Sequence, residues 1–322
     1  MRKLNMLIVL SVIAALAVLS FNVDVHAAKK WPDKPMELLI PTSPGSGASV
    51  YTQTVAKLAK KYLDQPMDVL HKPSGNGNDL CRFLMRQPAD ANSVAIYVGS
   101  MTGYMNLPGF ESKPTDFVYL MQMFKSLYSL YVHQDSPFKT IEDMIKYAKE
   151  NPGKLDIGSN KIGSVHFTNV ELFAKAAGIK INHVPYKGAG GARKDVMGKH
   201  LTAAVAQPYE VLSRSKYLRM LLLFDDKRMP ELPDLPVPSD LGYNYDTFYQ
   251  VYGIMLKKGA PADRLEILKA AFKKVMEEPE FVKLGDKTGN SIVFEDTDVF
   301  TQKVLKKTET VREILVELKV IK

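Results

Sequence analysis

Three segments rich in glycine and serine have residue types that could bind an anion. They cover Pro44–Ser49, Gly158–Ser164 and Tyr186–Gly191, and each lies between an apolar run and a segment with helical periodicity. The first turn of a helix leaves backbone N–H groups unpaired and carries the positive end of the helix dipole, so it attracts carboxylate or phosphate groups. Glycine lets a ligand approach the backbone, and serine adds hydroxyl donors. Together the three segments predict an anion-binding protein, although each one alone is also an ordinary turn and helix cap.

The sequence lacks the motifs of common catalytic and cofactor-binding sites. It contains neither Gly-x-Ser-x-Gly nor His-Glu-x-x-His, and Gly158–Gly163 is followed by Ser164 where a Walker loop has lysine. Gly45-x-Gly47 is followed by Val50 where a dinucleotide fingerprint has its third glycine. We therefore expect neither a catalytic centre nor a cofactor.

The histidines and the cysteine do not form a metal-binding pattern. The histidines after residue 27 have no metal-ligand spacing; they are His71, His133, His166, His183 and His200. Cys81 is the only cysteine, so the chain cannot form an internal disulfide or a thiolate metal cluster, and we expect a small buried apolar side chain. His166 stands in the first turn of an expected helix. It is the histidine best placed to contact a ligand, and a packed or capping histidine is the alternative.

Alternating strands and helices are expected to position these segments. Apolar runs predict strands over residues 36–40, 67–70, 94–98, 117–124, 127–133, 155–158, 181–184, 203–206, 219–223, 248–256 and 291–294. Helical spacing predicts helices over residues 50–65, 80–85, 140–149, 165–177, 192–197, 261–277 and 298–318, with a short one after Pro279. The alternation predicts an α/β fold with parallel sheets and helices on both faces. The glycine-rich segments then lie at the carboxyl ends of strands, where such sheets bind ligands.

The length of 322 residues is more than one core usually holds, so we expect two lobes. Strands near 128–133 and 249–256 are expected to cross between them. This predicts a discontinuous first lobe of residues 28–128 plus 253–322, and a second lobe of residues 129–252. The cleft between the lobes is the expected ligand site.

Residues 1–27 have the pattern of a cleavable signal peptide. Arg2 and Lys3 precede an uncharged apolar run of 14 residues from Met6 to Leu19, and a small-x-small ending follows at 25–27. A bilayer-spanning helix needs about 20 apolar residues. We therefore expect export of a soluble protein to the periplasm, with an uncleaved anchor as the alternative.

The charge balance favours anions but not nucleic acid. The chain has 43 Lys and Arg against 35 Asp and Glu, a net charge of +8. This sign attracts anions in general. The lysines are spread along expected helices without an aromatic-interleaved basic stripe, so we expect no nucleic-acid partner.

Several short motifs, in order along the mature chain, resemble one known family. They are residues 31–35, Pro44-Gly45-x-Gly47, residues 72–78, 147–155, 183–188 and 227–236. The most specific is Val-Pro-Tyr-Lys-Gly at 184–188. On these motifs the sequence is similar to the periplasmic solute-binding proteins of tripartite tricarboxylate transporters, also called Bug proteins.

The resemblance implies a fold, a function and a set of ligand-binding residues. The fold is a two-lobed periplasmic binding protein, type II-like, with two crossover strands and an interlobe cleft. The function is to capture a small organic carboxylate and deliver it to a tripartite tricarboxylate-type membrane permease. The implied ligand-binding residues are Ser43, Gly45, Ser46, Gly47 and Ser49 in the first lobe, and Ser159, Gly163, Ser164, His166, Tyr186, Lys187, Gly188 and Gln207 in the second. His166 is displaced by one position from the family's usual histidine.

Two departures from the family pattern bear on the substrate. The family's first loop commonly reads Pro-Gly-Gly-Gly-Thr-Asp, and here Ser49 has the acidic place. A second acidic residue of the family is replaced around Ala206 and Gln207. A ligand ammonium group has fewer partners without these carboxylates. The hypothesis is therefore a carboxylate ligand without an ammonium group.

Two other functions stay open at this point. Closure of the same cleft could be sensed by a membrane sensor kinase, which makes the protein a carboxylate sensor. A hydrolase or transferase that uses Ser164 and His166 is the third reading, although no further group is evident to orient the histidine ring.

Overall fold

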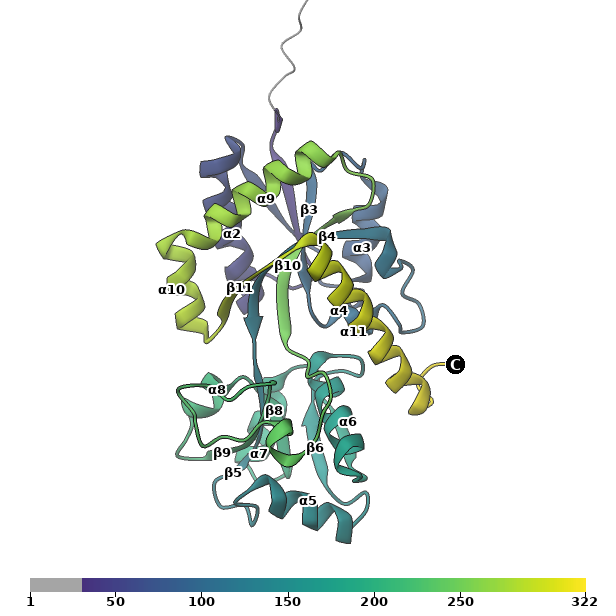
Figure 1. Cartoon of the computed structure of the whole chain (residues 1–322), viewed down its shortest axis with the longest axis vertical. Helices are drawn as coiled ribbons and strands as arrows, with labels where there is room; N and C mark the ends of the chain where they lie inside the picture. The colour runs from purple at the N-terminus through teal and green to yellow at the C-terminus, as the bar shows by residue number, and fades with distance from the viewer. Residues whose placement is uncertain (1–30) are drawn as a thin grey trace, which may run out of the picture. The chain divides into compact units, whose positions relative to one another are not determined.

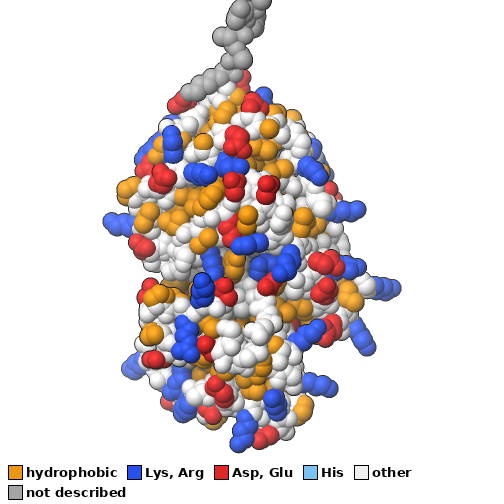
Figure 2. Space-filling model, in the orientation of Figure 1, with side chains coloured by type: hydrophobic (Ala, Val, Ile, Leu, Met, Phe, Trp, Pro, Cys, Tyr) orange, Lys and Arg blue, Asp and Glu red, His pale blue; other side chains and the backbone are white. Residues whose placement is uncertain are grey.

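The computed structural model describes residues 31–322, of which residues 34–322 form one compact unit. This unit has two α/β halves, each built on its own sheet (Figure 1). The predicted signal peptide over residues 1–27 lies outside the described residues. Among the described helices, none is both long and apolar enough to span a bilayer. Basic and acidic side chains are interspersed over the face shown in Figure 2.

Sheet A has six strands in the order β11-β4-β10-β3-β1-β2. They are β1 (Met36–Ile40), β2 (Met67–His71), β3 (Ser93–Val98), β4 (Phe117–Ser126), β10 (Gln250–Lys257) and β11 (Ser291–Asp296). β1 pairs in parallel with β2 and β3, whereas β10 is antiparallel to β3 and β4, and β11 is antiparallel to β4. β1 and β3 are almost wholly buried, which explains their continuous apolar runs.

The helices of the sheet A half form two groups. They are α2 (Gly47–Leu63), α3 (Asn78–Arg86), α4 (Met101–Tyr104), α9 (Ala262–Glu277), α10 (Pro279–Thr288) and α11 (Thr297–Glu317). α2 packs against α9 and α10, while α11 packs against α4 and β4. In Figure 1, α2 and α10 lie on the left of this half, α9 runs diagonally across its upper part, and α3, α4 and α11 lie on the right. Cys81 of α3 is buried as predicted, and burial raises the pKa of its thiol to about 12.

Sheet B has five strands in the order β7-β6-β8-β5-β9. They are β5 (Tyr128–His133), β6 (Asp156–Ser159), β7 (Asn182–Pro185), β8 (Ala203–Ala206) and β9 (Leu218–Phe224). β6 is parallel to β7 and β8, and β5 is antiparallel to β8 and β9. The helices of this half are α5 (Ile141–Glu150), α6 (Val165–Ala177), α7 (Ala189–Met197) and α8 (Pro208–Leu212).

Both sheets contain the expected parallel pairs, but both also contain antiparallel strands and are therefore mixed. β4 ends at Ser126 and β5 begins at Tyr128, so the chain passes directly from sheet A to sheet B. β10 brings the chain back into sheet A after β9. A strand that leaves a sheet and a strand that returns to it run in opposite directions, which makes the β4–β10 pair antiparallel.

The last helix contacts both halves. α11 begins beside β4, and its later residues Val311, Ile314 and Leu315 belong to the hydrophobic cluster around sheet B. The Lys175 ammonium of α6 also pairs with the Glu317 carboxylate of α11 at 2.6 Å. The lobe boundaries at residues 128–129 and 252–253 stay a prediction, and α11 is the element whose assignment to the first lobe depends on them.

Candidate functional site

The first predicted loop connects β1 to α2, and its serines stabilise the start of that helix. Ser46 is the N-cap residue of α2, and its hydroxyl accepts a hydrogen bond from the Ser49 N–H at 3.1 Å. The same hydroxyl donates to Thr42 Oγ1 at 2.9 Å. Ser49 is fully buried, and its hydroxyl accepts from Gln53 Nε2 at 3.4 Å. Both hydroxyls take part in the helix start, so the backbone N–H groups around Gly47 are what the loop can offer an anion.

The residues before this cap leave the loop open. Ser43 and Gly45 are exposed, and Gly45 has a φ of +80°, a left-handed conformation that favours glycine. No atom lies within 4 Å of the position that a Gly45 Cβ would take. The backbone of the first loop is therefore accessible from this side.

The second predicted loop connects β6 to α6 and contacts the sheet A half. Gly163 has a φ of +82°. Its carbonyl oxygen is so close to α4 that a Cβ on Gly103 would lie 2.0 Å from it. Only glycine fits at position 103 while the two halves are in this contact.

Two hydrogen bonds accompany the contact between the glycines. The Val165 N–H donates to Ser100 Oγ at 3.4 Å, and Lys161 Nζ donates to Asn76 Oδ1 at 2.9 Å. Each bond joins the β6–α6 segment to the sheet A half. The second predicted loop is therefore held by contacts from both halves.

His166 is buried against an aromatic ring and is neutral. Its ring centroid lies 4.0 Å from that of Tyr128, and its Nδ1 lies 3.1 Å from the Asn160 amide nitrogen, which donates to it. Burial lowers the pKa of His166 to about 3. A neutral imidazole cannot supply a positive charge to a carboxylate, so any contact it makes with a ligand is a hydrogen bond from Nε2.

No hydrogen bond joins Ser164 and His166, the pair suggested for a hydrolase, although both lie in the described part of the chain. The Ser164 hydroxyl caps α6 by accepting from the Phe167 N–H at 3.2 Å. His166 Nδ1 is engaged with Asn160. Each group is therefore already used in the local structure.

A different serine lies next to a histidine that sequence reasoning did not single out. The Ser159 hydroxyl is 2.6 Å from His183 Nε2, and His183 Nδ1 is 3.0 Å from Glu171 Oε1. The Ser159 hydroxyl also lies 2.8 Å from the Asn160 carbonyl, to which it can donate, and Ser159 is only 1% exposed. This chain of hydrogen bonds fixes the carboxyl end of β6, and the three residues come from positions too far apart to form a sequence motif.

The third predicted loop connects β7 to α7 and lies beside the second. Ser159 and Pro185 are register partners at the ends of β6 and β7, and the Tyr186 N–H donates to the Ser159 carbonyl at 2.8 Å. The Tyr186 hydroxyl donates to Asp195 Oδ2 at 2.5 Å, so it is tied to α7. Lys187 is exposed. The structure thus brings the second and third loops together.

The start of α7 has no capping side chain. Gly188 is its N-cap residue, and no side chain accepts from the first N–H groups of the helix. A Cβ at Gly188 or at Gly190 would have no atom within 4 Å. No capping side chain therefore competes with an anion for the N–H groups at this helix start.

Gln207 connects the sheet B half to tyrosines at the junction. It is the N-cap residue of α8, and its side chain hydrogen-bonds to Tyr128 of β5. Burial raises the pKa of Tyr128 well above its usual value, an effect that nearby Tyr252 increases and that Gln207 partly offsets. The Tyr252 ring lies 5.2 Å from the ring of Tyr51, four residues after Gly47 in α2. A line of aromatic residues therefore runs from the helix of the first loop towards His166.

Several residues at this junction were missed by sequence reasoning. Tyr128 and Tyr252 lie on strands that were expected to cross, and that expectation was the one available signal for them. The Ser100 N–H and hydroxyl both donate to Gln250 Oε1, at 3.2 and 3.3 Å. Neither of these two residues belongs to a recognisable motif, because only the fold brings positions 100 and 250 together.

The two halves also touch on the α10 side. A Cβ on Gly289, which follows α10, would lie 2.9 Å from the ring of Tyr209 in α8. Together with the Gly103–Gly163 contact, this gives a contact between the halves on each side of the crossing strands.

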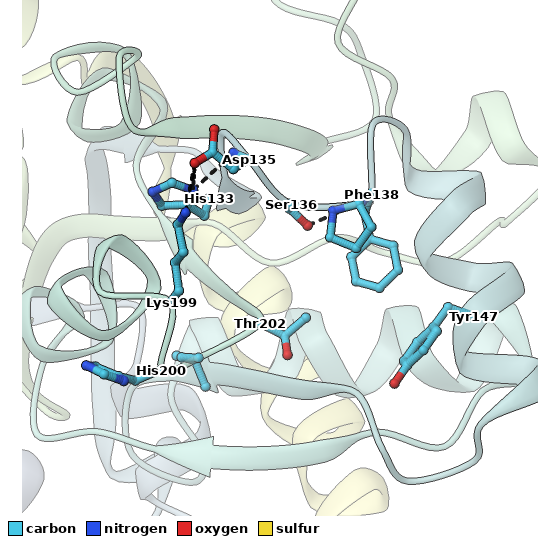
Figure 3. A pocket seen from close by; sticks show the side chains of 10 residues that line it. His133, Asp135, Ser136, Phe138, Tyr147, Lys199, His200 and Thr202 are labelled. Carbon is cyan, nitrogen blue, oxygen red and sulfur yellow. Dashed lines mark hydrogen bonds and ion pairs between the residues drawn. The ribbon is translucent and has the colours of Figure 1, made fainter.

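A cavity of about 590 Å³ lies in the sheet B half, away from the predicted site (Figure 3). Lys199 pairs there with the Asp135 carboxylate at 2.8 Å, and His133 Nδ1 accepts from the Asp135 N–H at 3.0 Å. These contacts hold turns at the surface, and none of the predicted site residues lines the cavity. Over residues 31–322 no group of three or more His, Cys, Asp or Glu side chains is arranged to hold a metal ion.

The fold is that of a two-lobed binding protein. Strands that cross directly between the two α/β halves join them, and the halves touch through a strand-to-helix loop. Residues 50–319 match the family model described as the tripartite tricarboxylate transporter family receptor. The chain belongs to this family, as the sequence motifs predicted.

Two relatives are similar to this chain over most of their length. A protein encoded in the gbd 5′ region of Cupriavidus necator is 29% identical over 261 residues, which are 79% of this chain and 78% of the relative. The protein BugT of Bordetella pertussis is 25% identical over 239 residues, 72% of this chain and 73% of BugT.

Several solved structures have the same fold. A TctC solute-binding protein from Polaromonas has a TM-score of 0.79 at 20% identity, over 89% of this chain and 99% of that one. An R. palustris protein solved with adipate has a TM-score of 0.73 at 19% identity, over 88% and 97% of the two chains. MatC from Rhodopseudomonas palustris, solved with malate, has a TM-score of 0.72 at 15% identity, over 88% and 100%.

Proposed function

We propose that this protein is a periplasmic solute-binding protein that captures a small organic carboxylate and delivers it to a tripartite tricarboxylate-type membrane permease. The family membership supports the role in solute binding. The structures solved with adipate and malate support carboxylates as a ligand class for this fold. The proposal includes no catalytic step.

One observation carries the choice of an anionic ligand. The second and third loops lie side by side at the carboxyl ends of β6 and β7, and α7 begins there without a capping side chain. Open N–H groups at a helix start favour a negatively charged group. A carboxylate bound at Gly188 and Gly190 would meet backbone donors with no Cβ in the way.

The first loop is proposed to hold the other end of the ligand. Its open residues Ser43 and Gly45 precede the first turn of α2. The two halves already touch at Gly103 and Gly163. A ligand that contacts the first loop and also the second and third loops would stabilise this arrangement, because it would make fewer contacts if the halves moved apart. In this proposal the ligand-contacting groups of the first loop are the backbone around Gly47 and the hydroxyl of Ser43.

The ligand is proposed to lack an ammonium group at this site. Ser49 occupies the acidic place of the family pattern and is fully buried. Gln207, at the second such place, is neutral and is hydrogen-bonded to Tyr128. Neither position supplies a carboxylate to an ammonium group, so submicromolar binding of aspartate or glutamate in calorimetry would refute this part of the proposal.

The test is a thermal-melt screen of the mature protein against aliphatic di- and tricarboxylates, aromatic carboxylates and acidic amino acids. A ligand at 100 times its dissociation constant stabilises the folded state by about 2.7 kcal/mol. That stabilisation raises the melting temperature by about 2–4 °C per kcal/mol for domains of this size. A shift with one carboxylate class is expected. The absence of any shift, together with no carboxylate released on denaturing extraction, would contradict the proposal.

A deletion strain tests delivery to a permease. Uptake of the labelled carboxylate should fall when the gene is deleted. Unchanged uptake with lost gene induction would instead indicate the sensor role.

A further inference from the structure

A second cavity, of about 510 Å³, lies where β4, β11 and α11 meet the two ends of the β9–β10 connection. None of the residues proposed for the carboxylate site lines it. Its polar wall includes Gln122, Lys125, Tyr245, Glu295, Lys303 and Lys307. We call it the hinge cavity. Figure 2 shows basic and acidic side chains mixed on the face where the two halves meet.

Three buried polar atoms around the hinge cavity have no hydrogen-bond partner. They are Gln122 Nε2, Tyr245 Oη and Glu295 Oε2, three of the five such side-chain atoms in the described part of the chain. Gln122 is only 1% exposed. Native proteins pair nearly all buried polar groups, because an unpaired one costs about 1–3 kcal/mol. Their concentration around one cavity points to a molecule that completes their hydrogen bonds.

One side of the hinge cavity is positive. Lys307 Nζ donates to the Thr247 carbonyl at 2.6 Å and lies 4.1 and 4.9 Å from the ring centroids of Phe248 and Tyr249. Over residues 31–322 no carboxylate forms an ion pair with Lys307. Burial lowers the pKa of Lys307 to about 8; the nearby Asp246 carboxylate opposes this shift, and Lys303 adds to it. This ammonium is still mostly charged at neutral pH and has donors to spare for an anion.

The other side of the hinge cavity is negative. Glu295 pairs with Lys303 through one carboxylate oxygen and leaves the other, Oε2, without a partner. Besides burial, nearby carboxylates raise the pKa of Tyr249; they are Glu295, Asp225, Asp226 and Asp246. Asp246 in turn pairs with Lys306, and Asp225 with Lys125. The Lys303–Glu295 pair shows that the positive and negative groups are adjacent.

We propose that the hinge cavity binds a small zwitterion, such as a free α-amino acid with a short side chain. The carboxylate would accept hydrogen bonds from Lys307, Gln122 and Tyr245, and the ammonium would donate to Glu295 Oε2. A simple anion leaves Glu295 Oε2 unpaired, and a simple cation leaves Gln122 Nε2 without an acceptor. The cavity volume lies in the range of small-molecule sites, roughly 300–1,000 Å³.

The experiment is a titration of the whole protein at pH 7 with L-alanine, acetate and ethylammonium, followed by calorimetry or ligand-observed NMR. L-Alanine is expected to bind at least about tenfold more tightly than either single-charge probe. Acetate binding as tightly as L-alanine would show an anion site and overturn the proposal. Failure of all three probes at millimolar concentration would mean that solvent alone satisfies these atoms, which also overturns it.

Variants place the binding in the hinge cavity. Lys307→Met is expected to weaken the binding of L-alanine by about tenfold. Glu295→Gln is expected to remove the preference for L-alanine over acetate. Gln122→Leu should also weaken binding, and it removes an unpaired amide, so it should fold at least as well as the parent chain. Lys199→Met removes the same charge as Lys307→Met in the distant cavity of Figure 3 and should bind L-alanine normally.

The carboxylate site must be distinguished from the hinge cavity. L-Alanine binding should persist in Gly47→Val and in the presence of a saturating dicarboxylate. Its loss in either case would assign the amino acid to the loops of the carboxylate site and overturn the inference, whatever the outcome for the proposed function.

Discussion

The backbones of Gly103 and Gly163 are in direct contact, since a Cβ on Gly103 would lie 2.0 Å from the Gly163 carbonyl oxygen. Gly103 belongs to α4 in the sheet A half, and Gly163 precedes α6 in the sheet B half. No flexible side chain at this point can move aside to make room. The halves reach this arrangement because position 103 has no side chain.

Replacing Gly103 by alanine should weaken ligand binding without unfolding the protein. The added Cβ would push the loop at Gly163 away from α4 and disfavour the arrangement in which both halves contact the ligand. We expect the dissociation constant of the carboxylate found in the melt screen to rise by at least about tenfold, equivalent to about 1.4 kcal/mol. Isothermal titration calorimetry measures this directly.

Gly109→Ala is the matched control for Gly103→Ala. A Cβ there would have no atom within 4 Å, but Gly109 has a φ of +85°. Alanine in this conformation should cost about 1–2 kcal/mol of folding stability and leave binding unchanged. Equal binding losses in the two variants would indicate general destabilisation rather than blocked closure.

Replacing Gly47 by valine should weaken carboxylate binding, because a branched side chain at the first residue of α2 blocks close approach to the backbone N–H groups. We expect a loss of at least about tenfold in affinity by calorimetry. Ala176→Val, at an exposed position of α6, is the control for valine in a helix and should cost only about 0.5 kcal/mol of stability. Normal binding by the Gly47 variant would show that the first loop is not a ligand subsite.

Replacing Ser46 by alanine should reduce the stability of the ligand-free protein. The Ser46 hydroxyl caps α2 by accepting from the Ser49 N–H and also donates to Thr42. Loss of an N-cap side chain costs about 1 kcal/mol, which urea unfolding can resolve. Ser43→Ala, at an exposed residue of the same loop, should change stability by much less. The two variants would behave alike if the cap had no energetic role.

The buried His166 should make the protein sensitive to acid. Its pKa is lowered from 6.5 to about 3 by burial. Between these values the unfolded chain binds a proton that the folded chain does not, so stability falls as the pH decreases through this window. The loss approaches about 1.4 kcal/mol per pH unit below the unfolded pKa.

The variant His166→Gln should remove most of this dependence. Between pH 6.5 and 4.5 its unfolding free energy should fall by about 2 kcal/mol less than that of the parent protein. His200→Gln, at an exposed position, provides the comparison. Parallel stability curves for the parent and His166→Gln would contradict a neutral buried His166.

Local patterns in the sequence were sufficient to predict most of the helices and strands. The periodicity over 165–177 predicted a helix that the structure has over Val165–Ala177, and Thr140 caps α5 as expected. These features depend on residues within a few positions of one another. The family was likewise evident from short motifs in a fixed order, and the family model confirms it.

The predicted site residues were identified as three separate loops, and the sequence could not indicate how the loops lie. The second and third are adjacent because β6 and β7 pair in register. Sheet A is mixed because β10 returns antiparallel to β4, more than a hundred residues after it in the chain, and sheet B is mixed because β5 is antiparallel to β8 and β9. No local pattern carries that information.

The sequence alone therefore determined most of the helices and strands, the family, and the glycine- and serine-rich loops suited to an anion. Only the tertiary structure decided that His166 packs on Tyr128, that Gly103 meets Gly163, and that Gln122, Tyr245 and Glu295 surround one cavity. The physical reason is the range of the interactions. Helix periodicity, caps and turns arise between near neighbours, whereas burial, pKa and hydrogen-bond partners depend on residues that only folding brings together.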